Sequence, residues 1–228
     1  MFGQRITRIF GIAAVLAVGV VAQASADPVL GIKLEEPGYA SFTTTGSSDP
    51  LIAVQNFGTF ALNVVVNTLA TNPLALDLGS TNVSSAAAGT LTILASATGL
   101  TSPLGLVDIL SQFSGNFVGD VISATFQTYV SNSNTMFGTD TLLASQSANG
   151  TPFSTSSTNS TTTNAPFAIT EVMTIKTAGL AILSLDGSAS AAHAVPEIDA
   201  KSGAAAIALL LGVLGLIGER RRKPNVAA

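Results

Sequence analysis

Apolar and polar residues alternate with a period of two along much of this 228-residue chain, and this pattern constrains its fold more than any other feature. The alternation is clearest in residues 59–69, 89–99, 120–130 and 166–176. Successive side chains of a β-strand point to opposite faces, so each segment predicts a strand with one buried face. The residues predicted to point inward are Leu62, Val64 and Val66; Leu91, Ile93, Ala95 and Ala97; Ile122, Ala124, Phe126 and Val130; and Phe167, Ile169, Met173 and Ile175.

Short turn signals separate these segments, and the body of the chain shows no long amphipathic helix pattern. The turn signals are Ser48-Asp49-Pro50, Asn72-Pro73, Thr98-Gly99, Asn149-Gly150 and Asp186-Gly187. This punctuation predicts an all-β fold, an antiparallel β-sandwich of the jelly-roll or Ig-like type. Residues 100–113 are expected to form a short helix or a loop. The Thr-rich residues 155–164 are expected to form an edge strand, followed by a hairpin at Ala165-Pro166.

The first 26 residues have the three parts of a secretory signal peptide. Arg5 and Arg8 form a charged start, residues 10–22 are apolar, and the small residues Ala24 and Ala26 mark a cleavage signature. A permanent N-terminal membrane helix is the alternative, but the apolar run is short and stops at this signature. The sequence therefore predicts export, with a mature chain that begins near Asp27.

The C-terminal region places an apolar run directly before a basic block. Residues 203–218 are small and apolar, which predicts a hydrophobic helix. At about 1.5 Å per residue, this helix spans less than the roughly 30 Å hydrocarbon core of a bilayer, so it is a marginal anchor. The block that follows is Arg220, Arg221, Arg222 and Lys223, and such a block stays in the cytoplasm by the positive-inside rule. We therefore expect transient anchoring in the inner membrane until the chain is cut before the run.

This tail resembles the PEP-CTERM protein-sorting signal of bacteria. The matching residues are Val195, Pro196 and Glu197, the apolar residues 204–217, and the three arginines. Ile198 and Asp199 continue the motif as in its VPEID variant, whereas residues 200–203 depart from the usual Pro-Gly-Ser. The resemblance implies recognition by an exosortase, a membrane-embedded protease-transpeptidase, and release to the outer surface or the exopolysaccharide matrix. An ordinary single-span anchor is the alternative.

The body also resembles a recurring type of PEP-CTERM cargo, over residues 76–100, 126–143 and 165–175. The resemblance implies a Ser/Thr-rich β body with no assigned enzymology. The sequence thus predicts a signal peptide at residues 1–26, a β-sandwich body at 27–192 and a sorting signal at 193–228.

Charge and cysteine content exclude several functions for the body. Residues 27–194 hold two cations, Lys33 and Lys176, against ten carboxylates, which gives a net charge of −8. Such a body repels nucleic acid and anionic lipid. The chain has no cysteine, so disulfides and thiol chemistry are absent.

Few residues of the body could carry catalysis. The one histidine of the chain, His193, lies beside the sorting motif and is expected to be a linker residue, which leaves no scaffolded Ser-His-Asp or zinc site. A paired-carboxylate glycosidase could use two of Glu35, Glu36, Asp108, Asp120 and Glu171. No cofactor is expected. Calcium would suit the loops of an anionic β-sandwich, but the sequence has no D-x-D-x-D-G loop.

Glu171 is the unusual carboxylate, because it falls in phase with the inward residues of 166–176. A buried carboxylate is costly unless it is paired or neutralised, so one interpretation is a ligand or metal site. The interpretation that we favour from sequence is a residue at the sheet rim, or a bulge that reverses the phase.

Together these features predict a secreted or cell-surface, non-enzymatic protein of the exopolysaccharide or biofilm matrix. It would contact polysaccharide or other surface proteins through a polar face. A carbohydrate-binding module with a defined groove is the first alternative, and a secreted glycoside hydrolase or lyase is the second.

Overall fold

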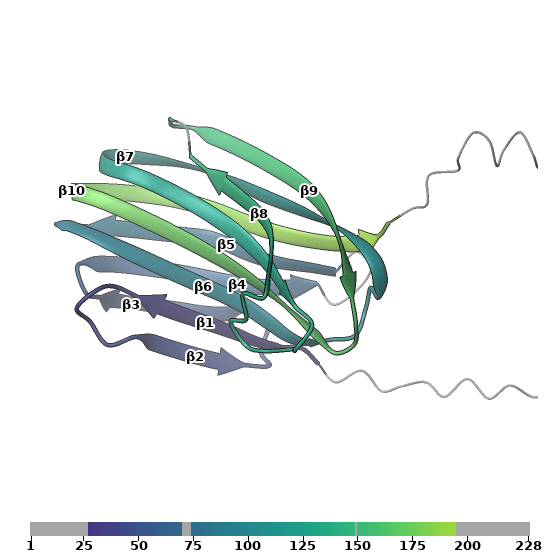
Figure 1. Cartoon of the computed structure of the whole chain (residues 1–228). Coiled ribbons are helices and arrows are strands. Elements are labelled where there is room, and N and C mark those ends of the chain that lie inside the picture. The colour runs from purple at the N-terminus through teal and green to yellow at the C-terminus, as the bar shows by residue number, and fades with distance from the viewer. Residues whose placement is uncertain (1–26, 70–73, 149, 195–228) are drawn as a thin grey trace, which may run out of the picture.

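The structure is a computed structural model, and it describes residues 27–69, 74–148 and 150–194. These residues form ten β-strands with antiparallel pairing throughout, and they contain no helix (Figure 1). The predicted all-β, antiparallel fold is confirmed. The strands are β1 (Val29–Glu35), β2 (Phe42–Gly46), β3 (Leu51–Phe57), β4 (Phe60–Leu69), β5 (Leu74–Ser85), β6 (Ala88–Leu100), β7 (Gly105–Ser131), β8 (Thr141–Ser147), β9 (Phe153–Thr163) and β10 (Phe167–His193).

Two strands of 27 residues, β7 and β10, form the centre of the sheet. They pair with each other from Ala168 to His193, with an interruption near the middle. On its other side, β10 pairs with β6 through residues 167–178 and with β5 through residues 181–191. The strands β5 and β6 therefore serve as the two halves of a third long strand.

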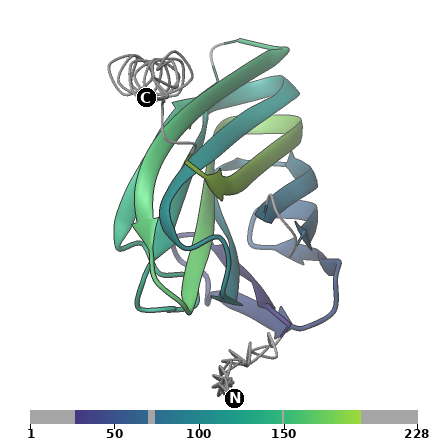
Figure 2. The same ribbon diagram turned by 90° about the vertical axis from the view of Figure 1, so that its right-hand side faces the viewer.

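All three long strands change register or break at the same level, which we call the corner. The corner contains residues 86–87 between β5 and β6, residues 119–121 of β7 and residues 177–181 of β10. The sheet bends there, and its two halves face each other as two layers (Figures 1 and 2). The first layer contains β2, β1, β6, the first half of β10, the second half of β7, and β8; the second layer contains β3, β4, β5, the second half of β10, the first half of β7, and β9.

Gly119 permits the bend of β7 at the corner, and its replacement is expected to be costly. Its φ is +88°, and a Cβ atom there would overlap the carbonyl oxygen of Leu180. We expect Gly119→Ala to lower the free energy of unfolding by roughly 2–4 kcal/mol, measured by urea denaturation. Gly105→Ala is the matched control, because Gly105 has a φ of +80° but nothing within 4 Å of a Cβ atom. The control should lose only about 1 kcal/mol, and equal losses would contradict a steric role for the corner glycine.

The two layers share one hydrophobic core. Phe113 of the second layer stacks on Phe126 of the first, with ring centroids 5.4 Å apart. Phe153 of β9 packs against Phe113 at 4.7 Å, and such aromatic pairs add to the stabilisation from burial. All the inward positions predicted in segments 59–69, 89–99 and 166–176 are buried. The period-two pattern therefore identified most of the core correctly.

Ile122 is the exception to this pattern. It was predicted to point inward with Ala124 and Phe126, which are fully buried, yet its side chain is 56% exposed. Ile122 lies next to the corner, where the bend of β7 and the register shift of its pairing end the simple alternation.

Four local expectations are wrong, and each failure comes from long-range pairing. Most of residues 100–113 belongs to β7 rather than to a helix or loop. Residues 155–163 do form an edge strand, but β9 pairs with β7 and not in a hairpin with β10. The Asp186-Gly187 signal lies inside β10 and the Thr98-Gly99 signal inside β6, and each marks a register shift in strand pairing and not a turn.

Both ends of the described body lie at the end of the layers opposite the corner, where β1 begins and β10 ends (Figure 1). The predicted signal peptide, the C-terminal helix and the sorting and basic residues lie outside the described residues. Within the described ranges, no helix is long and apolar enough to span a membrane. The choice between jelly-roll and Ig-like types stays a prediction.

Candidate functional site

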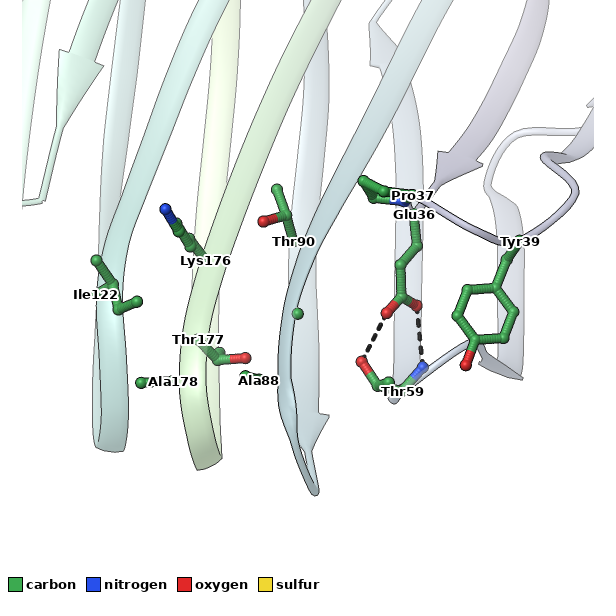
Figure 3. A pocket seen from close by; sticks show the side chains of 11 residues that line it. Glu36, Pro37, Tyr39, Thr59, Ala88, Thr90, Ile122, Lys176, Thr177 and Ala178 are labelled. Carbon is green, nitrogen blue, oxygen red and sulfur yellow. Dashed lines mark hydrogen bonds between the residues drawn. The ribbon is translucent and has the colours of Figure 1, made fainter.

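A groove of about 620 Å³ lies at the corner end of the first layer, and we call it the corner groove. It crosses four neighbouring segments: β7, β10, β6 and the turn that follows β1 (Figure 3). The side chains that define it are Glu36, Tyr39, Thr90, Ile122, Lys176 and Thr177. Its volume falls in the range of small-molecule sites.

One wall of the corner groove is a turn of sequence Glu36-Pro37-Gly38-Tyr39. The Tyr39 amide donates a hydrogen bond of 3.1 Å to the Glu36 carbonyl, and Gly38 has a φ of +91°. Proline followed by glycine with positive φ is the signature of a type II turn. The turn places Tyr39 at one end of the groove, beside Glu36 and Thr59, where the residue is 52% exposed (Figure 3).

The Glu36 side chain ties this turn to the loop between β3 and β4. One carboxylate oxygen accepts a hydrogen bond of 2.9 Å from the Thr59 amide, and the other accepts one of 2.7 Å from the Thr59 hydroxyl (Figure 3). Glu36 is only 6% exposed, so these charge-assisted bonds form in a partly dry environment and are strong. The arrangement fixes the backbone that carries Tyr39.

The opposite wall of the groove comes from the central strands. Lys176 of β10 lies directly across from Thr90 of β6, and Ile122 of β7 adds an exposed apolar surface. Lys33, the other described cation, forms an ion pair of 2.6 Å with Glu35. Among the described residues, Lys176 is therefore the cation with no ion pair.

Glu171 lies in the core and is fully buried, so the favoured rim or bulge interpretation is wrong and simple alternation was right. Neither carboxylate oxygen has a hydrogen-bond partner among the described residues. Desolvation is the main reason why the pKa of Glu171 is raised well above its ordinary value, and the charges of Asp77 and Asp186 raise it further. The backbone amides of Leu78 and Ala189 lie close enough to oppose this rise in pKa, although neither meets the geometry of a hydrogen bond to the carboxylate.

The carboxylates considered for a glycosidase are spread along the fold: Glu35 ends β1 and Glu36 follows it, Asp108 and Asp120 lie 12 positions apart in β7, and Glu171 lies in β10. Glu35 is in an ion pair with Lys33, Asp108 accepts a 2.5 Å hydrogen bond from Ser160, and Asp120 lies at the corner. Within the described ranges, no three His, Cys, Asp or Glu side chains converge to hold a metal ion. Glu171 as a ligand or metal site stays a prediction.

His193 differs from its expected place. It is the last residue of β10 and pairs with Val107, so it belongs to the sheet and not to a linker. The amide of Ala194 continues this contact with a hydrogen bond to the Leu106 carbonyl.

Sequence reasoning missed the corner groove. The Pro37-Gly38 pair was the one local signal, because it predicts a turn that presents the next residue. The pairing of Lys176 with Thr90, 86 positions apart in the chain, has no local signature.

Residues 195–225 match the family model of the VPEID-CTERM protein sorting domain. The chain therefore carries a PEP-CTERM-type sorting signal, as the sequence predicted. A sorting domain of this class implies processing by an exosortase, and it is consistent with export and transient membrane anchoring. The predicted motif Val195–Asp199 falls within the matched range.

A search of curated proteins found no match. Among solved structures, the chain is similar to TmCBM61 in complex with β-1,4-galactotriose, at 8% identity and a TM-score of 0.31, with 61% of this chain and 92% of that chain covered. It is also similar to the isomalto-dextranase of Arthrobacter globiformis T6 complexed with panose, at 11% identity and a TM-score of 0.23, with 69% and 30% covered. Likenesses with TM-scores below 0.5 do not establish a shared fold.

Proposed function

We propose that this chain is a secreted, exosortase-sorted component of the cell surface or the exopolysaccharide matrix, with a non-enzymatic β-sandwich body. The observation that carries the proposal is the position of the sorting domain: β10 ends at His193, and the VPEID-CTERM match begins at residue 195. The core residues that the structure describes lie between Leu30 and Ala191, ahead of the matched domain, which supports a body that keeps its fold when the tail is cut away.

The geometry of the body supports display at a surface. The first strand begins and the last strand ends opposite the corner, so the sorting tail joins the body at one end (Figure 1). The corner groove lies at the other end. A body held by its tail would therefore carry the groove on the side away from the point of attachment.

The edge strand β9 supplies a polar face of the kind that the proposal requires. Every second side chain of β9 is exposed, and all of these are hydroxyl residues: Ser154, Ser156, Thr158, Ser160 and Thr162. Uncharged hydroxyls donate and accept hydrogen bonds, which suits contact with a hydrated polymer.

The glycosidase alternative has weaker support. Such an enzyme needs two carboxyl groups that flank one scissile bond. The corner groove holds one described carboxylate, Glu36, and both its oxygens are engaged by Thr59. A turnover assay on polysaccharide substrates tests this alternative. If the unmodified protein were active and Glu36→Gln abolished the activity, the glycosidase alternative would take the place of the non-enzymatic proposal.

Fractionation of producing cells tests the proposed sorting. We expect residues 27–194 to be recovered in the extracellular or matrix fraction from cells with an active exosortase. In a strain that lacks the exosortase, we expect a larger form to accumulate in the membrane fraction, because the apolar run then stays attached. An identical distribution in the two strains would contradict the proposal.

A further inference from the structure

We propose that the corner groove binds a segment of neutral saccharide, with the Tyr39 ring as the stacking platform. This inference rests on the proposed surface function and names the ligand class of the groove. It is carried by the exposed aromatic ring, the fixed turn beneath it and the balanced charge of the groove.

Tyr39 has the properties of a rigid aromatic platform. The residue is half exposed, yet its backbone is held by the type II turn and by the two Glu36–Thr59 hydrogen bonds. A side chain on a fixed backbone loses little conformational freedom on binding, so more of the contact energy appears as affinity. Tyrosine also combines an apolar face with a polar hydroxyl, which matches the two chemical faces of a sugar ring.

The rest of the groove repeats this combination of apolar and polar surface. Ala88, Ala178 and Ile122 provide apolar contact area, and Thr90 and Lys176 provide hydrogen-bonding groups. Ligand sites commonly combine an apolar lining with a few polar groups that fix orientation. A sugar can place its C–H face on the apolar surface and its hydroxyls toward the threonine and the ammonium group.

The charges favour a neutral ligand over an acidic one. Among the described residues that line the groove there is one carboxylate, Glu36, and one cation, Lys176, so the charges of this lining balance. The body around it carries a net charge of −8, which repels a polyanion at long range. An acidic polysaccharide would therefore gain one favourable contact against many unfavourable ones.

The length of the groove favours an oligosaccharide. The groove runs across β7, β10 and β6 to the turn after β1, which are neighbours in this order in the first layer. Strands in a sheet lie about 4.8 Å apart, so three spacings give a track of about 14 Å. A ligand of this length lies across the strands with one end on Tyr39 and the other near Ile122.

Tyrosine fluorescence offers a direct test, because the chain has no tryptophan and only two tyrosines, Tyr39 and Tyr129. In the Tyr129→Phe variant, Tyr39 is the sole emitter. The exported protein would be titrated with glucose-, galactose- and mannose-based neutral hexaoses, and with oligogalacturonate as the acidic probe. We expect a saturable change in emission with at least one neutral series, at an affinity that changes little between low and high salt.

Calorimetry on the unlabelled variants then assigns the contacts. Tyr39→Ala should lower the affinity about tenfold or more, Tyr39→Phe should retain most of it, and the matched control Tyr129→Phe should bind like the unmodified protein. Three results would each overturn the proposal: no saturable binding to any neutral series, unchanged affinity in Tyr39→Ala, or a preference for oligogalacturonate that salt abolishes. Because Tyr39→Ala should leave extracellular recovery unchanged, failure of the groove proposal is distinguishable from failure of the sorting proposal.

Discussion

Replacement of Glu171 with methionine is expected to stabilise the body by about 2 kcal/mol at neutral pH, which raises the melting temperature by roughly 4–8 °C. Glu171 is fully buried, and neither of its carboxylate oxygens has a hydrogen-bond partner among the described residues. Methionine has a similar length, no charge and enough flexibility to fill the same space. Most core substitutions destabilise a protein, so a gain of this size would be diagnostic.

The same residue should give the body an unusual dependence of stability on pH. Burial and the charges of Asp77 and Asp186 raise the pKa of Glu171 in the folded state above 4.5, its ordinary value. Below about pH 4.5 the Glu171 carboxyl is protonated in both the folded and the unfolded chain, so its titration does not lower the free energy of unfolding there. As the pH rises above that value, the unfolded chain releases the proton first, so the free energy of unfolding falls until the folded-state pKa is passed.

Thermal melts followed by circular dichroism between roughly pH 4 and pH 8 measure this effect. The limiting slope for one group is about 1.4 kcal/mol per pH unit, and Glu171→Met should remove most of it. A smaller slope in the same direction should remain, because burial and Asp186 also raise the pKa of Asp77. Glu35→Gln is the matched control, since Glu35 is a partly exposed carboxylate in a surface ion pair, and it should keep the full slope.

Two outcomes would contradict this account of Glu171. A lower melting temperature in Glu171→Met would mean that the carboxyl makes a favourable interaction that the variant loses. An unchanged slope would mean that other groups set the pH dependence. If Glu171→Gln instead abolished binding of a ligand or metal at nearly unchanged stability, the site interpretation made from the sequence would gain its first support.

The sequence predicted those parts of the fold that depend on local alternation. Leu62, Val64 and Ile93 are buried because the pleat of a strand sends every second side chain to the same face. The same rule placed Glu171 in the core, and the cost of burial suggested that the rule would fail there. It held, because Ile169 and Met173 on either side fix the phase of the strand.

The bend and the groove could not be predicted, because both are products of pairing between distant residues. Gly119 lies three positions before Ile122 and permits the bend, but a single glycine in a strand pattern does not predict that β7 changes layers there, so the exposure of Ile122 follows from the corner. Glu36 was considered as half of a catalytic pair. Its partner is instead Thr59, 23 positions away, and the carboxylate holds a turn in place.

Processing of the exported chain is expected to stop when Pro196 and Glu197 are both replaced with alanine. These residues belong to the sorting motif within the matched domain, so an exosortase should no longer recognise the tail. The apolar run and the basic block stay intact, and uncut protein should accumulate in the membrane. Mass spectrometry of the membrane and extracellular fractions distinguishes the two forms by the mass of residues 203–223.

Two further variants separate recognition from anchoring. Replacing Arg220, Arg221 and Arg222 with alanine removes the charges that resist passage, each worth about 2.5–3.5 kcal/mol at the bilayer centre on insertion scales. That variant should be retained less well in the membrane, and some of it should be exported with its tail attached. A chain that ends at Ala194 should be exported with no membrane stage, because β10 is already complete there.

The decisive comparison is the unmodified protein in a host with an active exosortase. In the proposed sequence of events, the basic block and the apolar run hold the tail in the membrane, and the exosortase then recognises the motif and cuts the chain. The mature protein should therefore lack residues 203–223. If the extracellular protein still carries these residues, the tail is a plain membrane anchor and release must occur by another route. If the Pro196 and Glu197 double variant is processed like the unmodified chain, the cut depends on residues outside the motif.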